Sequence, residues 1–375
     1  MYGFESIMKN LWYTLLILVI FSTCISPFSV ESLNTDRILN VEGFITTVPK
    51  VHEIRLSYSM PFGPEFTGPG PGIITATVYL RDNLGNVEVL NLKPPLDNFD
   101  RLRGFYQTSA DFSAIVGRSY TLHIELVDGS KYQSFPEIVS PVPEVDSVTY
   151  HAVRSATEDI LNDQIGVEIR AHFQDPSDVK NNYYWKTLES DFVLVAEPEL
   201  HMSVKDCCEI CYHKEMPFPL NVNTVSDIDF NGLYQRRAIA YVVDNGVRFK
   251  DTYRLDVQHL SISDEAHRFL KLISQQVNLS GSVFDPPPAN IRGNMINIDD
   301  PSEQVLGYFF ASDERFLRTY IQKSKLEFVQ TPATIIPFDC REYLDPDGKN
   351  RDPRIGFFPP PLPVDPPADW NPPGN

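Results

Sequence analysis

The residues best suited to chemistry form the cluster DCCEICYH at 206–213, which contains Cys207, Cys208, Cys211 and His213. Thiolate and imidazole groups are the preferred ligands of zinc, so the cluster suggests a metal site. No second Cys/His pair follows at zinc-ribbon spacing, however, and Tyr212 stands where a c-type haem site needs a histidine. The spacing therefore favours disulfides over a bound metal, and we predict neither a metal nor another cofactor.

The cysteine count supports the same interpretation. The chain has five cysteines, and if Cys24 is acylated or removed with a leader, four remain. An even number of cysteines is typical of an exported protein whose disulfides form in an oxidising compartment. We predict that one bond reaches Cys340 from the cluster. Four cysteines allow three pairings, and the sequence does not choose among them.

Other groups that could do chemistry are carboxylates. The pairs Asp227/Asp229 and Asp299/Asp300 are most simply turn residues. The segment DPDGKNRD at 345–352 has calcium-like oxygen ligands, but its glycine comes too early for an EF-hand loop. The chain contains no GxSxG elbow, HExxH helix or phosphate-binding glycine loop. The sequence therefore indicates no enzyme class.

The stretch GSVFDPPPANIRGNM at 281–295 is the most distinctive loop. Three successive prolines force an extended path without backbone donors, and Gly293 permits a turn after them. We predict a rigid corner that carries the chain from a helix to the next strand. The alternative is a binding loop that presents Arg292 and Asn294, because rigid loops often carry recognition.

The N-terminus predicts export. Lys9 precedes an apolar run of about a dozen residues, which suits a signal-peptide core and is short for a membrane span. We predict a signal peptide over 1–23, followed by Cys24 as a lipidation site carrying acyl chains such as palmitate. Phe21 and Thr23 depart from the usual lipoprotein signal. Two or more chains would hold a soluble domain stably on a membrane.

Composition limits the partners. The net charge of −18 argues against nucleic acid, whose phosphates would be repelled. Of the 375 residues, 42% are hydrophobic, which allows sizeable buried cores. Aromatic residues are plentiful, with 24 Phe and 17 Tyr, and these favour strands over helices.

The elements that must position these residues are mainly strands. After a short anchor linker at 24–37, HEIRLSYSM at 52–60 alternates apolar and polar residues, which is typical of a strand with one buried face. Further alternating segments follow, separated by short turns. We therefore predict a mainly β fold that begins with an immunoglobulin-like (Ig-like) or fibronectin-like antiparallel β-sandwich over 38–140. The proline-rich stretch 136–145 indicates a boundary.

A second β-rich (α+β) domain is predicted over 145–330, with strands such as GVEIRAHFQ and TYRLDVQHLSI. It contains one long amphipathic helix over 263–278. Ser263 suits its N-cap, and an apolar stripe follows at helical spacing. We expect the proline-rich tail over 331–375 to be extended and partly disordered.

Several of these segments together resemble a known family. LNVEGFIT, GRSYTLHIELVDGSKYQS, LDVQHLSISDEAHRFL, GSVFDPPPANIRGNM and DPSEQVLGYFFAS are similar, in this order, to segments of the Bacteroidetes lipoproteins grouped as domain of unknown function 4249 (DUF4249). The similarity extends from Cys24 to about Gln322. Genes of this family commonly lie beside those of TonB-dependent outer-membrane receptors.

The resemblance implies a lipid-anchored protein of the outer membrane, on the cell surface or the periplasmic face. It would act without catalysis, holding a ligand or a TonB-dependent receptor as an accessory to nutrient uptake. One alternative is a cell-surface structural or adhesion module. The other is a surface hydrolase with an unrecognised acid pair.

Overall fold

The strands form where apolar and polar residues alternate. In the computed structural model, HEIRLSY contains β2 (Glu53–Tyr58) and GVEIRAHFQ lies within β10 (Gln164–Gln174). Strands make up 45% of the described residues, which confirms the prediction of a mainly β protein. In the described part of the chain, no helix is both long and apolar enough to cross a lipid bilayer.

The structure describes residues 37–59, 70–94, 103–156, 163–200, 207–217, 222–277, 291–345 and 360–373. Contacts divide the chain into a unit of residues 1–37 with 59–70 and a unit of residues 38–58 with 71–375. Every described strand and helix belongs to the second unit. The predicted signal peptide and Cys24 lie outside the described residues.

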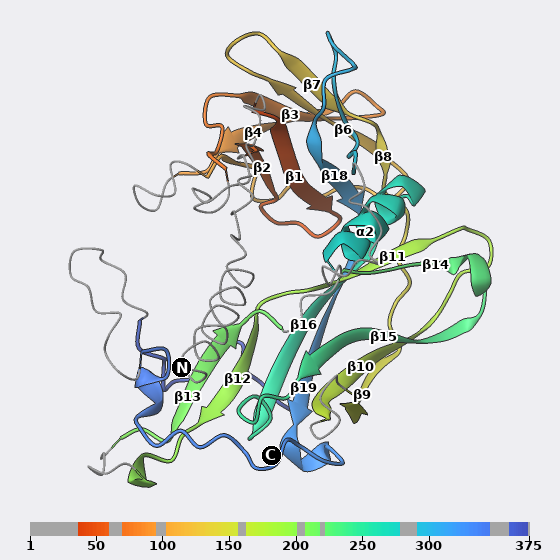
Figure 1. The fold of residues 1–375 in the computed structure, drawn as a ribbon. Coiled ribbons are helices and arrows are strands. Elements are labelled where there is room, and N and C mark those ends of the chain that lie inside the picture. Colours follow the sequence, from red (N-terminus) through yellow and green to blue (C-terminus); the bar gives the residue numbers. More distant parts are fainter. Residues whose placement is uncertain are drawn as a thin grey trace, which may run out of the picture. The chain divides into compact units, whose positions relative to one another are not determined.

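The first sheet has ten strands in the order β17-β7-β6-β3-β4-β5-β2-β1-β18, with β8 paired to β6 (Figure 1). Its strands are β1 (Leu39–Thr46), β2, β3 (Thr77–Asp82), β4 (Val87–Leu92), β5 (Phe105–Gln107), β6 (Ser119–Glu125), β7 (Lys131–Ser134), β8 (Glu137–Ile138), β17 (Met295–Asn297) and β18 (Leu306–Ser312). All its pairs are antiparallel except β1–β18, which is parallel. Two strands from the range predicted for the second domain thus belong to this sheet, while the predicted domain limits stay a prediction.

The two ends of this sheet approach each other, so that it is nearly a closed barrel. Asn294, just before β17, joins them. Its side-chain Nδ2 donates to the backbone oxygen of Phe309 at 2.8 Å, and the Phe309 N–H donates to Asn294 Oδ1 at 3.0 Å. The amide therefore takes the place of a neighbouring peptide group. We call this pair of bonds the Asn294 clamp.

Two glycines allow this approach. A Cβ on Gly293 would lie 1.5 Å from the backbone oxygen of Gly307, and a Cβ on Gly307 would lie 1.9 Å from that of Val41. Gly307 also has a φ of +85°, in the region that favours glycine. Gly293 does not have a positive φ, so close approach, rather than the predicted turn, requires a glycine there.

The remaining strands form two further sheets. One has the order β15-β10-β9, from β9 (Ser147–Ser155), β10 and β15 (Tyr234–Val243). The other has the order β13-β12-β16-β11-β14, with β19 paired to β16, from β11 (Asn182–Thr187), β12 (Ser190–Val195), β13 (Ile210–Glu215), β14 (Asn223–Ser226), β16 (Thr252–Ser261) and β19 (Glu314–Gln322). They share one core, in which Phe173, Tyr183, Trp185 and Tyr253 are almost fully buried.

The predicted helix is present as α2 (Asp264–Val277). Ser263 Oγ accepts from the Ala266 N–H at 3.1 Å, as expected of an N-cap. Ala266 and Leu270 are buried against Tyr308 and Phe310 of β18. The apolar stripe of the helix therefore packs on the outer face of the first sheet.

Part of the proline-rich tail packs on the second core. Leu362 is 7% exposed and belongs to that core. Asp369 accepts from Arg254 at 2.8 Å and from Arg318 at 2.7 Å, and the Trp370 ring lies over the Arg254 guanidinium. The described tail residues 360–373 are thus held against β16 and β19, whereas the sequence predicts an extended and partly disordered tail.

Candidate functional site

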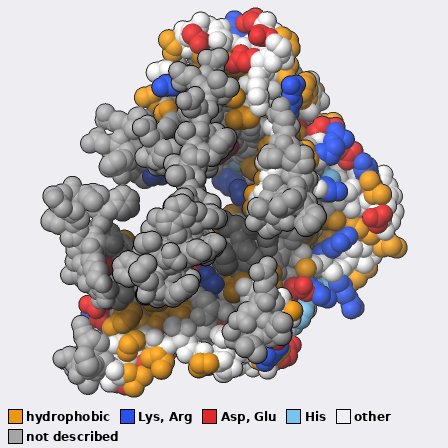
Figure 2. Space-filling view, in the orientation of Figure 1, with side chains coloured by type: hydrophobic (Ala, Val, Ile, Leu, Met, Phe, Trp, Pro, Cys, Tyr) orange, Lys and Arg blue, Asp and Glu red, His pale blue; other side chains and the backbone are white. Residues whose placement is uncertain are grey.

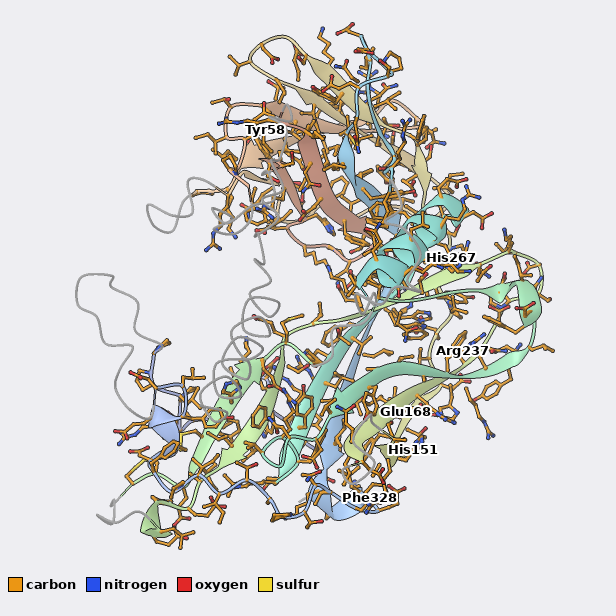
Figure 3. All side chains as sticks on the ribbon, in the orientation of Figure 1. Tyr58, His151, Glu168, Arg237, His267 and Phe328 are labelled. Atoms are coloured by element: carbon orange, nitrogen blue, oxygen red, sulfur yellow. A yellow bond between two sulfur atoms is a disulfide. The ribbon has the colours of Figure 1, made fainter. Side chains whose placement is uncertain are left out.

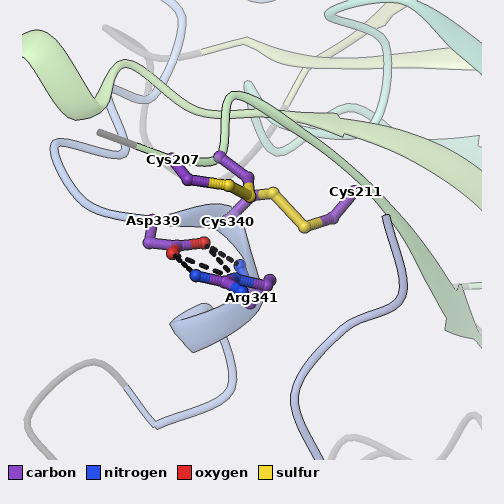
Figure 4. Close-up of a disulfide and its surroundings, with 6 residues drawn as sticks. Cys207, Cys211, Asp339, Cys340 and Arg341 are labelled. Atoms are coloured by element: carbon purple, nitrogen blue, oxygen red, sulfur yellow. Dashed lines mark hydrogen bonds and ion pairs between the residues drawn. A yellow bond between two sulfur atoms is a disulfide. The ribbon is translucent and has the colours of Figure 1, made fainter. Parts of the chain in front are cut away.

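The four downstream cysteines lie together at one corner. Cys211 on β13 is joined to Cys340, with a Cα–Cα distance of 5.7 Å, and Cys207 is joined to its neighbour Cys208 (Figure 4). Cys340 begins the short 3-10 helix η5 (Cys340–Glu342). Cys211 and Cys340 are fully buried. Of the three pairings that the sequence leaves open, the structure has the one in which Cys211 reaches Cys340.

The alternative metal set is not brought together. Cys211 is bonded to Cys340, and the His213 ring packs against Phe192 and Tyr343, where burial lowers its pKa. The sulfurs of Cys207 and Cys208 do lie within 4.8 Å of an Asp339 oxygen. Asp339, however, accepts hydrogen bonds from the Arg341 guanidinium, and disulfide sulfurs are not thiolates. The four cysteines therefore form two disulfides rather than a metal site, and we call the Cys211–Cys340 bond the disulfide staple.

The distinctive loop lies partly outside the described residues, which resume at Ile291. Arg292 is exposed, whereas Asn294 is 3% exposed and holds the clamp between β17 and β18. Asn294 Nδ2 also lies 3.1 Å from Glu137 Oε1. This burial favours the interpretation of a rigid corner for Asn294.

A buried carboxylate completes the corner. Glu137 accepts from the Tyr308 hydroxyl at 2.6 Å and from the Ser263 hydroxyl at 2.8 Å, in addition to Asn294. Burial raises its pKa, against the lowering effect of these three donors. Glu137 thus ties the start of α2 to β18.

The two carboxylate pairs act in turns. Asp227 Oδ2 accepts from the Asn181 N–H at 2.6 Å, and Asp227 and Asp229 form the 3-10 helix η3. Asp300 Oδ1 accepts from the Ser302 N–H at 3.0 Å. Of the calcium-like set, Asp345 is described, and Asp347 and Asp352 lie outside the described residues. These placements agree with the turn interpretation.

Surface charges elsewhere form small ion groups. His151 on β9 and Glu168 on β10 lie on neighbouring strands, with His151 Nε2 3.4 Å from Glu168 Oε1 (Figure 3). Glu168 also pairs with Arg170. Lys and Arg side chains gather over the region of α2 and β14 (Figure 2). Several of these, such as Lys180, are paired with acidic residues.

A cavity of about 840 Å³ is the strongest candidate for a ligand site. Its wall follows from strand alternation. On β1, Val41 and Ile45 point into the barrel core, so Glu42 and Phe44 lie on the outer face. On β18, Phe309 belongs to the barrel core, whereas Tyr308 and Phe310 face α2 and the cavity. Side chains of β2, β5, β11, β16 and α2 and of loop residues at 50–52, 291 and 304 complete the lining.

The cavity combines aromatic rings with charged groups. The rings of Phe44 and Phe310 are stacked in parallel, 4.1 Å between centroids, and Phe269 of α2 packs against Tyr308 at 4.9 Å. Among the lining cations, Lys50 pairs with Glu314 at 2.6 Å. An apolar wall with a few polar groups is typical of small-molecule sites.

Sequence reasoning missed this cavity. The segment NYYWKTLE is typical of a strand, and Lys186 interrupts its aromatic face. Lys186 shares one face of this otherwise buried strand with Tyr184, two residues earlier. A lysine in such a position is the signal that could have indicated the cavity. The other lining residues come from distant segments, and only the fold brings them together.

Two buried histidines predict a pH dependence of stability. His259 is fully buried, its ring stacked on Trp185 at 3.6 Å, and burial holds its pKa well below the usual value of 6.5. His52 is 3% exposed, and burial, with a smaller effect of Lys50, lowers its pKa to about 4. Below pH 6.5 the unfolded chain therefore binds protons that the folded chain does not.

We expect the free energy of unfolding to fall as the pH drops from 6.5 to 4, with His52 alone contributing about 3 kcal/mol over this range. His259→Phe, which keeps a flat ring beside Trp185, is expected to reduce the slope by up to about 1.4 kcal/mol per pH unit. Urea unfolding of the wild type and the variant at a series of pH values measures this slope of the free energy of unfolding against pH. An unchanged slope in the variant would show that His259 does not contribute.

The architecture and the cavity define a class: a β-rich protein with a disulfide staple and a mixed aromatic and charged site. The family model described as Domain of unknown function (DUF4249) matches residues 25–318. The chain belongs to this family, which confirms the DUF4249 part of the resemblance seen in its motifs. A search of curated proteins finds no match.

Proposed function

We propose that the protein is a non-enzymatic binding protein, anchored to the outer membrane by lipid on Cys24, that holds a ligand as an accessory to TonB-dependent uptake. The observation that carries the binding role is the cavity, whose volume and mixed lining suit a small molecule. The anchor and the receptor come from the N-terminal sequence and from the resemblance to Bacteroidetes lipoproteins.

Two finer features belong to the same proposal. The protein faces either the cell surface or the periplasm, tethered through acyl chains. Within the nearly closed first sheet, the strands of residues 38–140 follow an Ig-like or fibronectin-like β-sandwich arrangement. Intact-mass analysis of the mature protein tests the anchor, and an N-terminus downstream of Cys24 without lipid mass would contradict it.

The binding role predicts two results with the full chain purified from crosslinked membranes. We expect a TonB-dependent receptor to co-purify with it, because an accessory must meet its transporter. We also expect native mass spectrometry to detect a bound small molecule that is lost from Phe44→Ala, because this change removes one ring of the stacked wall. The control is Leu84→Ala. Leu84 is exposed and does not line the cavity, so this variant is expected to keep the bound molecule.

The outcomes separate the alternatives. Absence of both a receptor and a bound molecule would contradict the proposal. Recovery of a cleaved product instead of an intact ligand would favour the surface hydrolase. Retention of the ligand by Phe44→Ala, with unchanged folding by circular dichroism, would place the binding site elsewhere in the molecule.

A further inference from the structure

One cation in the cavity differs from its neighbours. Lys186 follows Trp185 on β11, and because side chains alternate, Lys186 lies on the strand face opposite the buried tryptophan. Its Nζ lies over the ring of Phe44, 4.8 Å from the centroid. Among the described residues, no carboxylate lies within ion-pair distance of this ammonium group.

The other lining cations are paired. Lys50 contacts Glu314, which also accepts from Gln258 at 2.7 Å, and Arg55 lies 3.6 Å from Glu42. Glu314 is therefore already used by two donors. Burial and the nearby charge of Lys50 both lower the pKa of Lys186, and the charge of Glu314 opposes them only in part. A negative ligand group would offset both effects, since opposite charge favours the ammonium form.

The apolar wall beside Lys186 is rigid and flat. Phe44 and Phe310 stack with an interplanar angle of 1°, and Phe310 in turn contacts Tyr308 at 4.4 Å. Tyr308 and Phe310 are at most 5% exposed and are held by α2. Such a wall favours a planar apolar body, because aromatic surfaces pair best in offset-stacked or edge-on contacts.

Charged side chains of both signs line the cavity. The chain carries −18, whereas the cavity is lined by the three cations Lys50, Arg55 and Lys186 and by the two carboxylates Glu42 and Glu53. Two further lining groups with shifted pKa values, His52 and Tyr308, are neutral near pH 7. Because Glu314 pairs with Lys50 and Glu42 lies beside Arg55, Lys186 is the lining cation that a negative ligand group would pair with.

We propose that the cavity binds an organic anion with a flat apolar body, an inference that rests on the proposed binding function. Its carboxylate or similar acidic group pairs with Lys186 Nζ, and its body lies along Phe44 and the neighbouring rings. Lys186 therefore determines charge specificity, and the aromatic wall provides most of the contact area. A cavity of about 840 Å³ lies within the usual size range for such ligands.

The test compares two probes of similar shape, 1-naphthoate and the uncharged 1-naphthalenemethanol, by titration calorimetry on the full chain at pH 7.5. We expect the wild type to bind the anion more tightly. Lys186→Met is expected to weaken naphthoate binding by about 10- to 100-fold, the usual worth of a hydrogen bond to a charged group, and to leave the alcohol unchanged. Lys214→Met, at an exposed lysine of β13, is the control.

Each outcome decides a separate point. Equal binding of both probes, unaffected by Lys186→Met, would overturn the charge specificity while leaving the cavity as a binding site. Failure of both probes to bind the wild type would overturn the proposed ligand class. It would not overturn the binding function, which the co-purification experiment tests separately. Thermal melting verifies that the variants fold, and Lys186→Gln replaces Lys186→Met if the latter does not.

Discussion

Replacing Cys211 and Cys340 together with alanine is expected to lower the free energy of unfolding by about 5 kcal/mol. The bond joins residues that are 129 apart in sequence, and closing so long a loop removes much of the entropy of the unfolded chain. Both side chains are also fully buried, so the alanines leave unfilled space in the second core. Denaturant unfolding of protein made in an oxidising compartment measures the loss.

The neighbouring pair is the matched control. Cys207 and Cys208 are adjacent, so their bond closes no chain loop, and Cys207 is exposed. Cys207→Ala with Cys208→Ala is expected to cost less than about 1 kcal/mol, because no loop-closure entropy is lost. Equal losses in the two double variants would contradict the loop-closure explanation. A reducing agent is expected to remove the loop-closure contribution from the wild type but to leave it more stable than Cys211→Ala/Cys340→Ala, because the reduced thiols still fill the core.

Asn294→Ala is expected to destabilise the protein by about 3–5 kcal/mol, the range for breaking a buried polar network. The change leaves the Phe309 N–H and carbonyl without the side chain that bonds both, and it removes one donor from the buried Glu137. Unpaired polar groups in a buried position carry the full cost of lost hydration. Equilibrium unfolding in urea, followed by tryptophan fluorescence and circular dichroism, measures this.

Arg292→Ala, two residues earlier, is the control. Arg292 is exposed, so its replacement is expected to change stability by no more than about 0.5 kcal/mol. The pair also separates the two interpretations of the loop. If Arg292→Ala abolished binding to a receptor with stability unchanged, the loop would be a recognition element as well as a corner. A stable Asn294→Ala variant would show that the clamp is dispensable.

The sequence predicts the local elements well because their signals are local. Alternation identifies strands such as β2 and β10, and the cap at Ser263 together with the apolar stripe identifies α2. Burial of Asn294 has no such signal, because its partner Phe309 is 15 residues away and on another strand. The parallel pairing of β1 with β18 joins residues more than 260 positions apart, which no periodicity can reveal.

The candidate site was less predictable than the fold. Cysteine count indicates disulfides, and a bond to Cys340 was expected, but the choice of Cys211 depends on where β13 places its side chains. The cavity depends on Phe44, Lys186 and Phe269, which come from three separate elements. Phe44 and Phe269 are ordinary in their own segments, and only Lys186 departs from its local pattern. They form a binding surface only because the fold places them in one cavity.

The β1–β18 pairing has a consequence for how the protein is made. A nascent chain that has been translated only to residue 140 already contains β1, with Phe44 on its outer face, but not the strand that covers its edge. Open strand edges recruit other chains, so this intermediate is prone to aggregate until β18 is synthesised. Passage through an export channel in an unfolded form would avoid that hazard. A shortened clone ending at 140 should therefore precipitate, whereas the full chain should not.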